Sequence, residues 1–153
     1  MPQANITPPT VNASIDYSTG KDVDGVPIQY GLSVEGRRAN EAITRGQLVQ
    51  LLAATATTPL SVEVADAAAM AYNVYGVAVE SAAADSICRV ATDIGWVLCT
   101  TTVAAGADLA AGTAGVVTET GADETGRCCE ALSADIDDFF GTSNDAILVR
   151  FTR

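Results

Sequence analysis

The chain has 153 residues, of which 48% are hydrophobic and 5% aromatic, and its formal net charge is -11. This length fits one compact domain, or one domain with an extended arm, and the apolar content is enough for a sizeable core. The acidic balance excludes the basic surface that binds nucleic acid or anionic membranes. The absence of histidine excludes Ser-His-Asp catalysis, Cys-His catalysis and histidine-based zinc sites.

The first part of the chain is predicted to be an extended arm and linker over residues 1–42, ahead of a β-rich body over residues 43–153. Pro8-Pro9 is incompatible with a helix, and each proline favours extended geometry in the residue before it. The arm carries spaced apolar side chains, namely Ile6, Val11, Ile15 and Tyr17, and then Val23, Val26, Ile28 and Tyr30. A disordered tail rarely carries so many, so the pattern favours a docking arm over the alternative of an unstructured terminus.

The body is predicted to contain short strands separated by glycine and polar turns. The predicted strands are Gln47–Leu52, Leu60–Val64, Asn73–Glu80, Ile87–Thr92, Ile94–Thr101, Val116–Thr118, Arg127–Leu132 and Ala146–Phe151. Gly76 is predicted to mark a bulge or a close backbone approach. Many short strands at such intervals are typical of an all-β barrel or sandwich, and no clean internal repeat is evident.

Three other segments complete the predicted body. Asp66–Ala71 is predicted to form one short helical turn, and Ser133–Phe140 a short helix with Ser133 as its N-cap. The alanine- and glycine-rich segment Val103–Gly115 is predicted to be loops around a short stretch at Leu109. The fold class is therefore mainly β, with one or two short helices.

The four cysteines are Cys88, Cys99, Cys128 and Cys129. The chain opens without a basic and apolar leader and has no apolar window of membrane-spanning length, so we expect cytosolic synthesis and reduced thiols. Buried, unpaired cysteines are the favoured interpretation, and a Cys88–Cys99 disulfide is the sharper alternative. Adjacent residues of a strand point to opposite faces, so one residue of the vicinal pair Cys128-Cys129 is expected to be buried and the other exposed or at an interface.

No catalytic site, metal site or cofactor site can be assembled from the sequence, and we expect no enzyme. Asp135, Asp137 and Asp138 form the densest acidic cluster, but they lack the EF-hand spacing, so a solvated acidic turn is favoured over a calcium site. The glycines of residues 106–115 do not match a phosphate-binding loop.

Several motifs, in their order along the chain, resemble a known family. They are Ile43-Thr44-Arg45-Gly46-Gln47-Leu48-Val49-Gln50-Leu51, then Val74-Tyr75-Gly76-Val77-Ala78-Val79 with a following alanine run, then Gly95-Trp96-Val97, then Ala104-Ala105-Gly106-Ala107-Asp108-Leu109 followed by Ala110-Ala111-Gly112, and the terminal strand. Together they are similar to the capsid decoration, or cement, proteins of tailed phages. The chain departs from that family after Val79 and in its long proline-bearing arm.

The resemblance implies a small β-barrel or β-tulip body that forms a homotrimer on the outer surface of an expanded phage head and stabilises the head against internal DNA pressure. It implies the major capsid protein as partner, a location on the virion exterior and synthesis in the host cytoplasm. The residues predicted to bind the capsid are Ile6, Val11, Ile15, Tyr17, Arg37 and Arg38. Trp96 and Tyr75 are predicted to lie at the oligomer interface, although Trp96 is also a candidate core residue.

Two other functions remain open. The chain is alternatively a different virion module, such as a head-fibre base or a tail or baseplate component. The third hypothesis is a carbohydrate- or calcium-binding β-module that uses the acidic cluster at residues 135–138.

Overall fold

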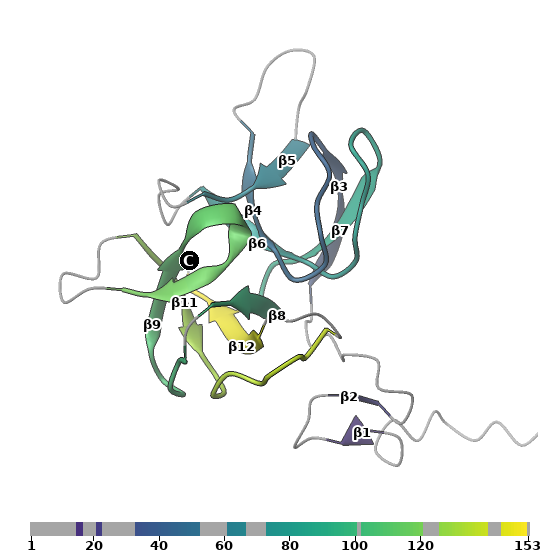
Figure 1. Ribbon diagram of the computed structural model, residues 1–153. Helices are drawn as coiled ribbons and strands as arrows, with labels where there is room; N and C mark the ends of the chain where they lie inside the picture. The colour runs from purple at the N-terminus through teal and green to yellow at the C-terminus, as the bar shows by residue number, and fades with distance from the viewer. Residues whose placement is uncertain are drawn as a thin grey trace, which may run out of the picture.

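The computed structural model describes residues 33–52, 61–66, 73–100, 102–120, 126–140 and 145–152, and it assigns two short strands before them. These are β1 (Ile15–Asp16) and β2 (Lys21–Asp22), which pair antiparallel. The described body is mainly β, as predicted, and it forms two small closed barrels (Figure 1). None of the described residues belongs to a helix long and apolar enough to cross a membrane.

The first barrel closes in the order β3-β5-β4-β6-β7. Its strands are β3 (Val34–Ala39), β4 (Leu48–Leu51), β5 (Ser61–Val64), β6 (Val74–Ala78) and β7 (Ile87–Ala91). Strands β3 and β5 run parallel, and the other neighbouring pairs are antiparallel. β3 belongs to this barrel, although its residues were predicted to be part of the linker. The strand was not predicted because its glycine and two arginines hide the alternation of apolar and polar residues.

The second barrel closes in the order β10-β8-β12-β11-β9. Its strands are β8 (Ile94–Cys99), β9 (Asp108–Ala111), β10 (Val117–Glu119), β11 (Arg127–Ala131) and β12 (Asp145–Phe151). Here β8 and β10 run parallel, and the other neighbouring pairs are antiparallel. The sequence predicted only loops around a short stretch at Leu109, whereas the structure has the strand β9 there.

The two barrels are an internal structural repeat, which the sequence analysis did not detect. Counted along the chain, the first strand of each barrel (β3 or β8) pairs parallel with the third (β5 or β10) and antiparallel with the fifth (β7 or β12). The second strand (β4 or β9) pairs with the third and with the fourth (β6 or β11). The registers also agree. The corresponding pairs include Ala39↔Val62 and Cys99↔Val117, Leu51↔Val62 and Ala111↔Val117, and Ala78↔Val90 and Ala131↔Val149.

The same turn leads into the second strand of each barrel. Gly46 and Gly106 occupy equivalent positions with φ of 87° and 85°, a region that favours glycine. Each glycine N–H donates to the carbonyl oxygen of an equivalent alanine, Gly46 to Ala78 at 2.9 Å and Gly106 to Ala131 at 2.8 Å. Two motifs that look distinct in the sequence are therefore one repeated structural motif.

Each barrel also has a β-bulge in its fourth strand. In β6 the register shifts at Tyr75, opposite Val49 and Gln50, and in β11 it shifts at Cys128. A Cβ on Gly76 would lie 2.2 Å from the carbonyl oxygen of Ala91. Gly76 therefore lies next to a β-bulge and also at a close backbone approach, so both alternatives predicted for this glycine are confirmed.

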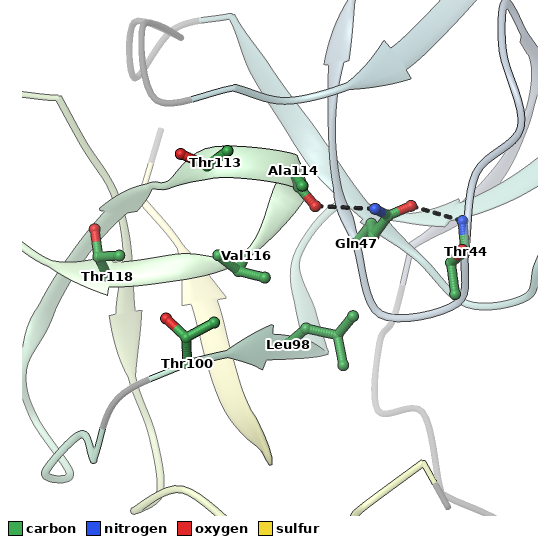
Figure 2. A pocket seen from close by; sticks show the side chains of 8 residues that line it. All are labelled: Thr44, Gln47, Leu98, Thr100, Thr113, Ala114, Val116 and Thr118. Carbon is green, nitrogen blue, oxygen red and sulfur yellow. Dashed lines mark hydrogen bonds between the residues drawn. The ribbon is translucent and has the colours of Figure 1, made fainter. Parts of the chain in front are cut away.

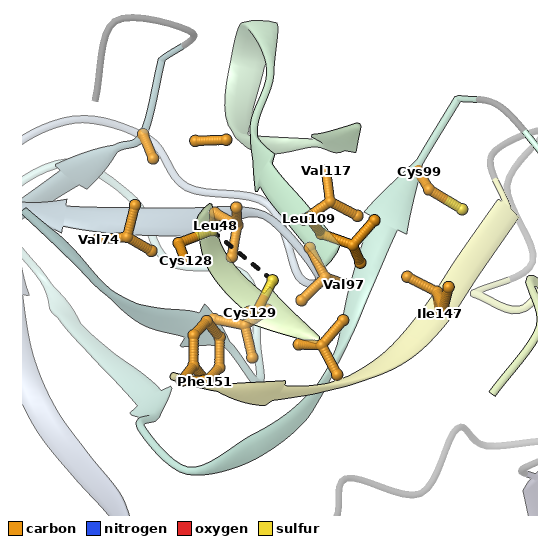
Figure 3. Packing of buried hydrophobic residues seen from close by; sticks show 14 of the residues in the cluster. Leu48, Val74, Val97, Cys99, Leu109, Val117, Cys128, Cys129, Ile147 and Phe151 are labelled. Carbon is orange, nitrogen blue, oxygen red and sulfur yellow. Dashed lines mark hydrogen bonds between the residues drawn. The ribbon is translucent and has the colours of Figure 1, made fainter. Parts of the chain in front are cut away.

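The largest hydrophobic cluster joins the interior of the second barrel to the outer wall of the first (Figure 3). It contains interior residues of the second barrel, such as Leu109, Val117 and Ile147, together with Leu48 and Val74 from the first. A separate cluster fills the first barrel and includes Val49, Val62, Cys88 and Val90. The barrels therefore share apolar packing and are not independent beads on a chain.

The segment from Ser133 to Phe140 is not the short helix that the sequence predicted. It crosses the outer face of β8 and β12, with an isolated bridge between Ile136 and Ala146. Asp138 has φ of 50°, which interrupts a right-handed helix. Ser133 does not cap a helix, because its hydroxyl oxygen accepts a hydrogen bond from Leu148 N at 3.1 Å.

Helical structure in the described residues is limited to the 3-10 turn Thr113–Gly115. The predicted helical turn Asp66–Ala71 lies largely outside these residues.

Candidate functional site

The two arginines predicted to bind the capsid lie on opposite sides of β3. Alternate residues of a strand point to opposite faces, and β3 sends Glu35, Arg37 and Ala39 toward the barrel interior, where Ala39 is buried. Val34 and Arg38 are exposed on the outer side. A single contact surface cannot therefore use both arginines in the same way.

Arg37 lies at one end of the first barrel, in a polar cluster with Glu35 and Tyr75. Arg37 Nε donates a hydrogen bond to the hydroxyl oxygen of Tyr75 at 3.0 Å, and the Tyr75 hydroxyl donates to the Glu35 carboxylate. Arg37 also forms an ion pair with Glu35. The hydrogen bond that Arg37 donates to Tyr75, together with the nearby negative charge of Glu35, raises the pKa of Arg37. The cluster therefore holds Arg37 in its charged form, with Glu35 balancing its charge.

The outer side of β3 and β7 is the most exposed apolar region of the described body. Val34 is 47% exposed and Ile87 is 64% exposed. They lie among two ion pairs, Arg38 with Asp85 and Arg89 with Glu80. Gly36 lies beside Ile87, and a Cβ added there would be 3.3 Å from Ile87 Cγ2. We call this surface, formed by Val34, Gly36, Arg38, Ile87 and Arg89, the β3–β7 face.

Trp96 and Tyr75, the two predicted interface residues, are both buried within the single chain. Trp96 is 3% exposed and stacks on Phe139, with ring centroids 4.1 Å apart. Tyr75 is 8% exposed and belongs to the core of the first barrel. Trp96 thus has the core position that the sequence analysis allowed for it. The interface role of these two residues stays a prediction.

The arm residues predicted to bind the capsid are not part of the described side chains. Ile6, Val11 and Tyr17 lie outside the described residues, and for Ile15 the structure gives only its backbone pairing with Asp22 in β1 and β2. Their role in capsid binding also stays a prediction.

The four cysteines are free and buried, which confirms the favoured interpretation but contradicts the disulfide alternative and the expectation for the vicinal pair. Cys88 lies in the core of the first barrel and Cys99 in the cluster of the second, so no Cys88–Cys99 disulfide forms. Cys128 and Cys129 are both buried, at 2% and 0% exposed, with their sulfur atoms 3.6 Å apart. The bulge at Cys128 breaks the strict alternation of β11, and the first barrel covers this end of the second barrel. The contact with Cys128, together with burial, raises the pKa of Cys129.

The acidic cluster is composed differently from the prediction. Asp135 and Asp137 come together with Asp145, with carboxylate oxygens within 4.8 Å of one another, whereas the sequence grouped them with Asp138. One Asp135 oxygen accepts a hydrogen bond from Val103 N at 2.9 Å, so this side chain has a structural task. Exposed carboxylates of this kind do not by themselves define a metal site.

A surface pocket of about 480 Å³ lies between the barrels (Figure 2). Its lining residues are Thr44, Gln47, Leu98, Thr100, Thr113, Ala114, Val116 and Thr118. Gln47 joins the two barrels there, because its side-chain nitrogen donates to Ala114 O at 2.9 Å while its oxygen accepts from Thr44 N at 2.7 Å. This lining offers hydroxyl groups but no ionisable group, so it provides neither an acid nor a base.

Sequence analysis missed the β3–β7 face and the pocket. Ile87 is the first residue of a predicted strand, but the sequence does not reveal that its side chain is exposed, because that depends on the neighbouring strands. The pocket residues come from three separate segments, and small threonines carry no motif. The sequence did single out the adjacent pair Arg37-Arg38, but it assigned both residues to the linker and not to a strand.

Comparison with known proteins places the fold. A scan against models of protein families finds no match, and a search of curated proteins finds none. Among solved structures, a matching chain is the head fibre gp8.5 N base of bacteriophage phi29, at 15% sequence identity and a TM-score of 0.55. The match covers 78% of this chain and 93% of that chain. The two-barrel architecture of this chain is therefore similar to that of a phage head-fibre base.

Proposed function

We propose that this chain is a structural protein of a phage virion, which attaches to the outside of the head in the manner of a head-fibre base. The observation that carries the proposal is the match to the phi29 head fibre N base, because it extends over 93% of that chain and 78% of this one. This favours the head-fibre alternative over the cement role as the first hypothesis.

The chemistry of the described body is compatible with a structural role. Burial raises the pKa of the Cys99 thiol to about 12 and also raises that of the Cys88 thiol. Such thiols are poor nucleophiles at neutral pH. The pocket offers threonine hydroxyls without a neighbouring base. The net charge of -11 suits a surface that is exposed to solvent and away from DNA.

We assign the capsid contact to the arm residues Ile6, Val11, Ile15 and Tyr17, with the major capsid protein as partner and a homotrimer as the assembly. An extended segment can add to the sheet edge of a partner through main-chain hydrogen bonds, with its side chains in pockets. Several copies of such an arm in one assembly would increase the apparent affinity. Arg38 is the arginine suited to a contact outside the barrel, whereas Arg37 serves the polar cluster.

A cement role is the second candidate, and the ordered motifs that resemble decoration proteins favour it. Both candidates need binding to the head surface. They differ in the consequence, because a cement protein raises the resistance of the shell to heat or internal pressure, whereas a fibre base anchors a further protein without that effect.

The test is co-sedimentation of the purified chain with expanded, undecorated shells of the cognate phage, beside isolated tails. We expect the wild-type chain to sediment with shells at saturating stoichiometry. The full-length variant Ile6→Asp/Val11→Asp/Tyr17→Asp should lose binding, and the matched variant Thr7→Asp/Thr10→Asp/Ser14→Asp, with the same added charge, should retain it. Binding to tails alone would contradict the head location.

The same shells then separate the two candidates. A rise in the temperature at which saturated shells release DNA supports cementing, and an unchanged temperature supports the fibre base. If the triple arm variant binds as wild type does, the arm assignment is wrong although the head location stands.

A further inference from the structure

The contact between the two barrels joins two different surfaces. The apolar end of the second barrel packs on the outer wall of the first, where Leu48 and Val74 lie beside Cys128 (Figure 3). This wall, which we call the β4–β6 wall, consists of five buried residues that face away from the interior of the first barrel, namely Leu48, Ala65, Val74, Val77 and Val79. Because every barrel has both a wall and an end, a head-to-tail contact of this kind has no built-in limit to the number of barrels.

The contact is closely fitted. Leu98 N of β8 donates a hydrogen bond to Gly46 O at 2.9 Å, which joins the backbones of the two barrels. Gly115, with φ of 74°, packs against the first barrel so tightly that an added Cβ would lie 2.9 Å from Val64 Cγ1 and 3.0 Å from Leu48 O. A barrel therefore docks on the wall in one defined position, with the close packing of a protein interior.

The second barrel has a wall at the equivalent position, formed by β9 and β11. Two positions after the glycine of the shared turn, Leu48 of the first barrel corresponds to Asp108 of the second. Both carbonyl oxygens accept a hydrogen bond at 2.9 Å from the residue that follows the third strand, which is Ala65 in one barrel and Thr120 in the other. By register, the five positions of the β4–β6 wall are occupied in the second barrel by Asp108, Thr120, Arg127, Glu130 and Leu132, which we call the β9–β11 wall.

The β9–β11 wall is charged where the β4–β6 wall is apolar. Three of its positions carry Asp108, Arg127 and Glu130, and their equivalents in the first barrel are buried aliphatic residues. Arg127 Nη2 pairs with Asp108 Oδ1 at 3.0 Å, and the two side chains are 34% and 28% exposed. An apolar barrel end that docked here would remove this ion pair and Glu130 from water without offering a polar partner. The wall therefore has the geometry for a further barrel but not the chemistry.

The end of the first barrel, which is the other surface left outside the contact, is polar too. It carries Arg37, Glu35 and Tyr75, whereas the equivalent end of the second barrel is apolar. The two surfaces that meet inside the chain are thus apolar, and the two that remain outside are polar. The barrels themselves do not require this division, since both kinds of wall and both kinds of end occur on the same topology.

We propose that the β9–β11 wall is a docking surface for a barrel of the same fold, and that its charges, with the polar end of the first barrel, prevent a second copy of this chain from docking there. The two polar surfaces thus close the array at two barrels and keep copies from joining head to tail. The inference concerns only this contact between barrels. It is independent of the proposed function and does not limit assembly through the arm.

The test restores the apolar chemistry on each surface of the full-length chain. The wall variant Asp108→Leu/Arg127→Val/Glu130→Val gives the second barrel the residues of the β4–β6 wall. The end variant Glu35→Gly/Arg37→Val gives the first barrel the residues that the second has at its end. Urea unfolding shows whether each variant is folded, and Arg37→Val alone replaces the end variant if the double substitution unfolds the chain.

Binding is measured by fluorescence anisotropy, with the wall variant labelled at its N-terminus and an unlabelled partner titrated into it. We expect the wall variant to bind the end variant at least about 10-fold more tightly than it binds the wild type or itself, because only that pair joins an apolar wall to an apolar end. The control variant Asp93→Leu/Glu119→Val/Arg150→Val makes the same kinds of change at other surface positions of the second barrel. It should bind the end variant no better than the wild type does.

Two results would overturn the proposal. Equal binding of the wall variant to the end variant and to the wild type would mean that the polar surfaces do not prevent docking. Equal binding of the wall and control variants to the end variant would mean that loss of charge in general, and not the restored wall, drives association. Because these measurements use no phage shells, their failure is distinct from failure of the proposed function.

Discussion

The two barrels share one topology and one set of registers, yet their surroundings differ at both of the places where a barrel can meet a neighbour. The second barrel has an apolar end, with Val97, Ala111 and Cys128 in the cluster shared with the first barrel. The equivalent residues of the first barrel are Arg37, Leu51 and Tyr75, and there Arg37, Tyr75 and Glu35 form a polar cluster. The outer face of β8 and β12 is covered, whereas the β3–β7 face is exposed.

This difference indicates that the second barrel needs a cover on its end and outer face, whereas the first barrel tolerates exposure to solvent. An apolar barrel end is stable only when something covers it, and here the outer wall of the first barrel does so. A polar end, by contrast, needs no cover and discourages stacking of a further barrel, as polar terminal repeats do in repeat proteins. Contacts with other molecules are therefore expected on the first barrel and its arm.

The largest predicted effect tests the covered face. Phe139→Ala should lower the free energy of unfolding by about 3–5 kcal/mol, because Phe139 is completely buried against Trp96. Urea unfolding followed by the fluorescence of Trp96, the one tryptophan, measures this loss. Phe139→Leu keeps most of the buried apolar volume and should cost less than half as much. An alanine variant as stable as the wild type would show that the cover contributes little.

A second prediction tests the bulge that both barrels share. At Gly76 an added Cβ would lie 2.2 Å from Ala91 O and 2.8 Å from Val90 Cγ1, whereas the equivalent residue of the second barrel, Cys129, already has a side chain. Gly76→Ala should therefore destabilise the chain by about 1–3 kcal/mol through overpacking. Thermal unfolding of Gly76→Ala is compared with that of Gly106→Ala, in which no atom lies within 4 Å of the added Cβ. The comparison separates the steric clash at Gly76 from the effect of replacing a glycine in general. Gly106 has φ of 85°, so its variant reports backbone strain alone.

Most of the strands could be predicted from the sequence, but the repeat could not, for a physical reason. Strand positions need only an apolar side chain of suitable size on the inner face, so Val49 and Leu109, or Cys88 and Ile147, serve equally well. The turn into the second strand needs a glycine for its positive φ, and there Gly46 and Gly106 are identical. A repeat maintained by geometry at so few positions leaves little trace in the sequence.

The candidate site was predicted less well, because its features depend on contacts between distant segments. Arg37 and Arg38 were singled out from the sequence, and their role in capsid binding stays a prediction. Only the pairing of β3 shows that one lies at the barrel end with Tyr75 and the other outside. The segment at Phe139 was predicted to be a helix from its local composition. Its structure is decided instead by Trp96, which lies more than 40 residues earlier in the chain.

The third prediction concerns pH and compares Cys99 with its equivalent in the first barrel, Ala39. Burial, with smaller contributions from Asp135 and Asp145, raises the pKa of Cys99 from 9.0 to about 12. The folded chain therefore keeps this proton while the unfolded chain loses it, so stability is fully present below pH 9 and declines as pH rises toward 12. The expected slope is about 1.4 kcal/mol per pH unit for this group. Cys99→Ala should reduce the slope in urea titrations between pH 9 and pH 10.5, and an unchanged slope would contradict the assignment.

The smallest predicted effect concerns the polar end of the first barrel. Tyr75→Phe removes the hydroxyl that accepts from Arg37 and donates to Glu35 but keeps the buried ring, so the free energy of unfolding should fall by about 1 kcal/mol. Arg37→Val goes further, since it gives this end the residue that Val97 provides in the second barrel. That variant should self-associate, because an apolar barrel end is then exposed without a cover. Sedimentation of Arg37→Val beside Arg150→Val, which removes the same charge from an exposed position, measures the effect. If both variants have the same state of association as the wild type, the polar cluster does not prevent the stacking of one barrel on another. The difference between the two barrel ends then has another cause.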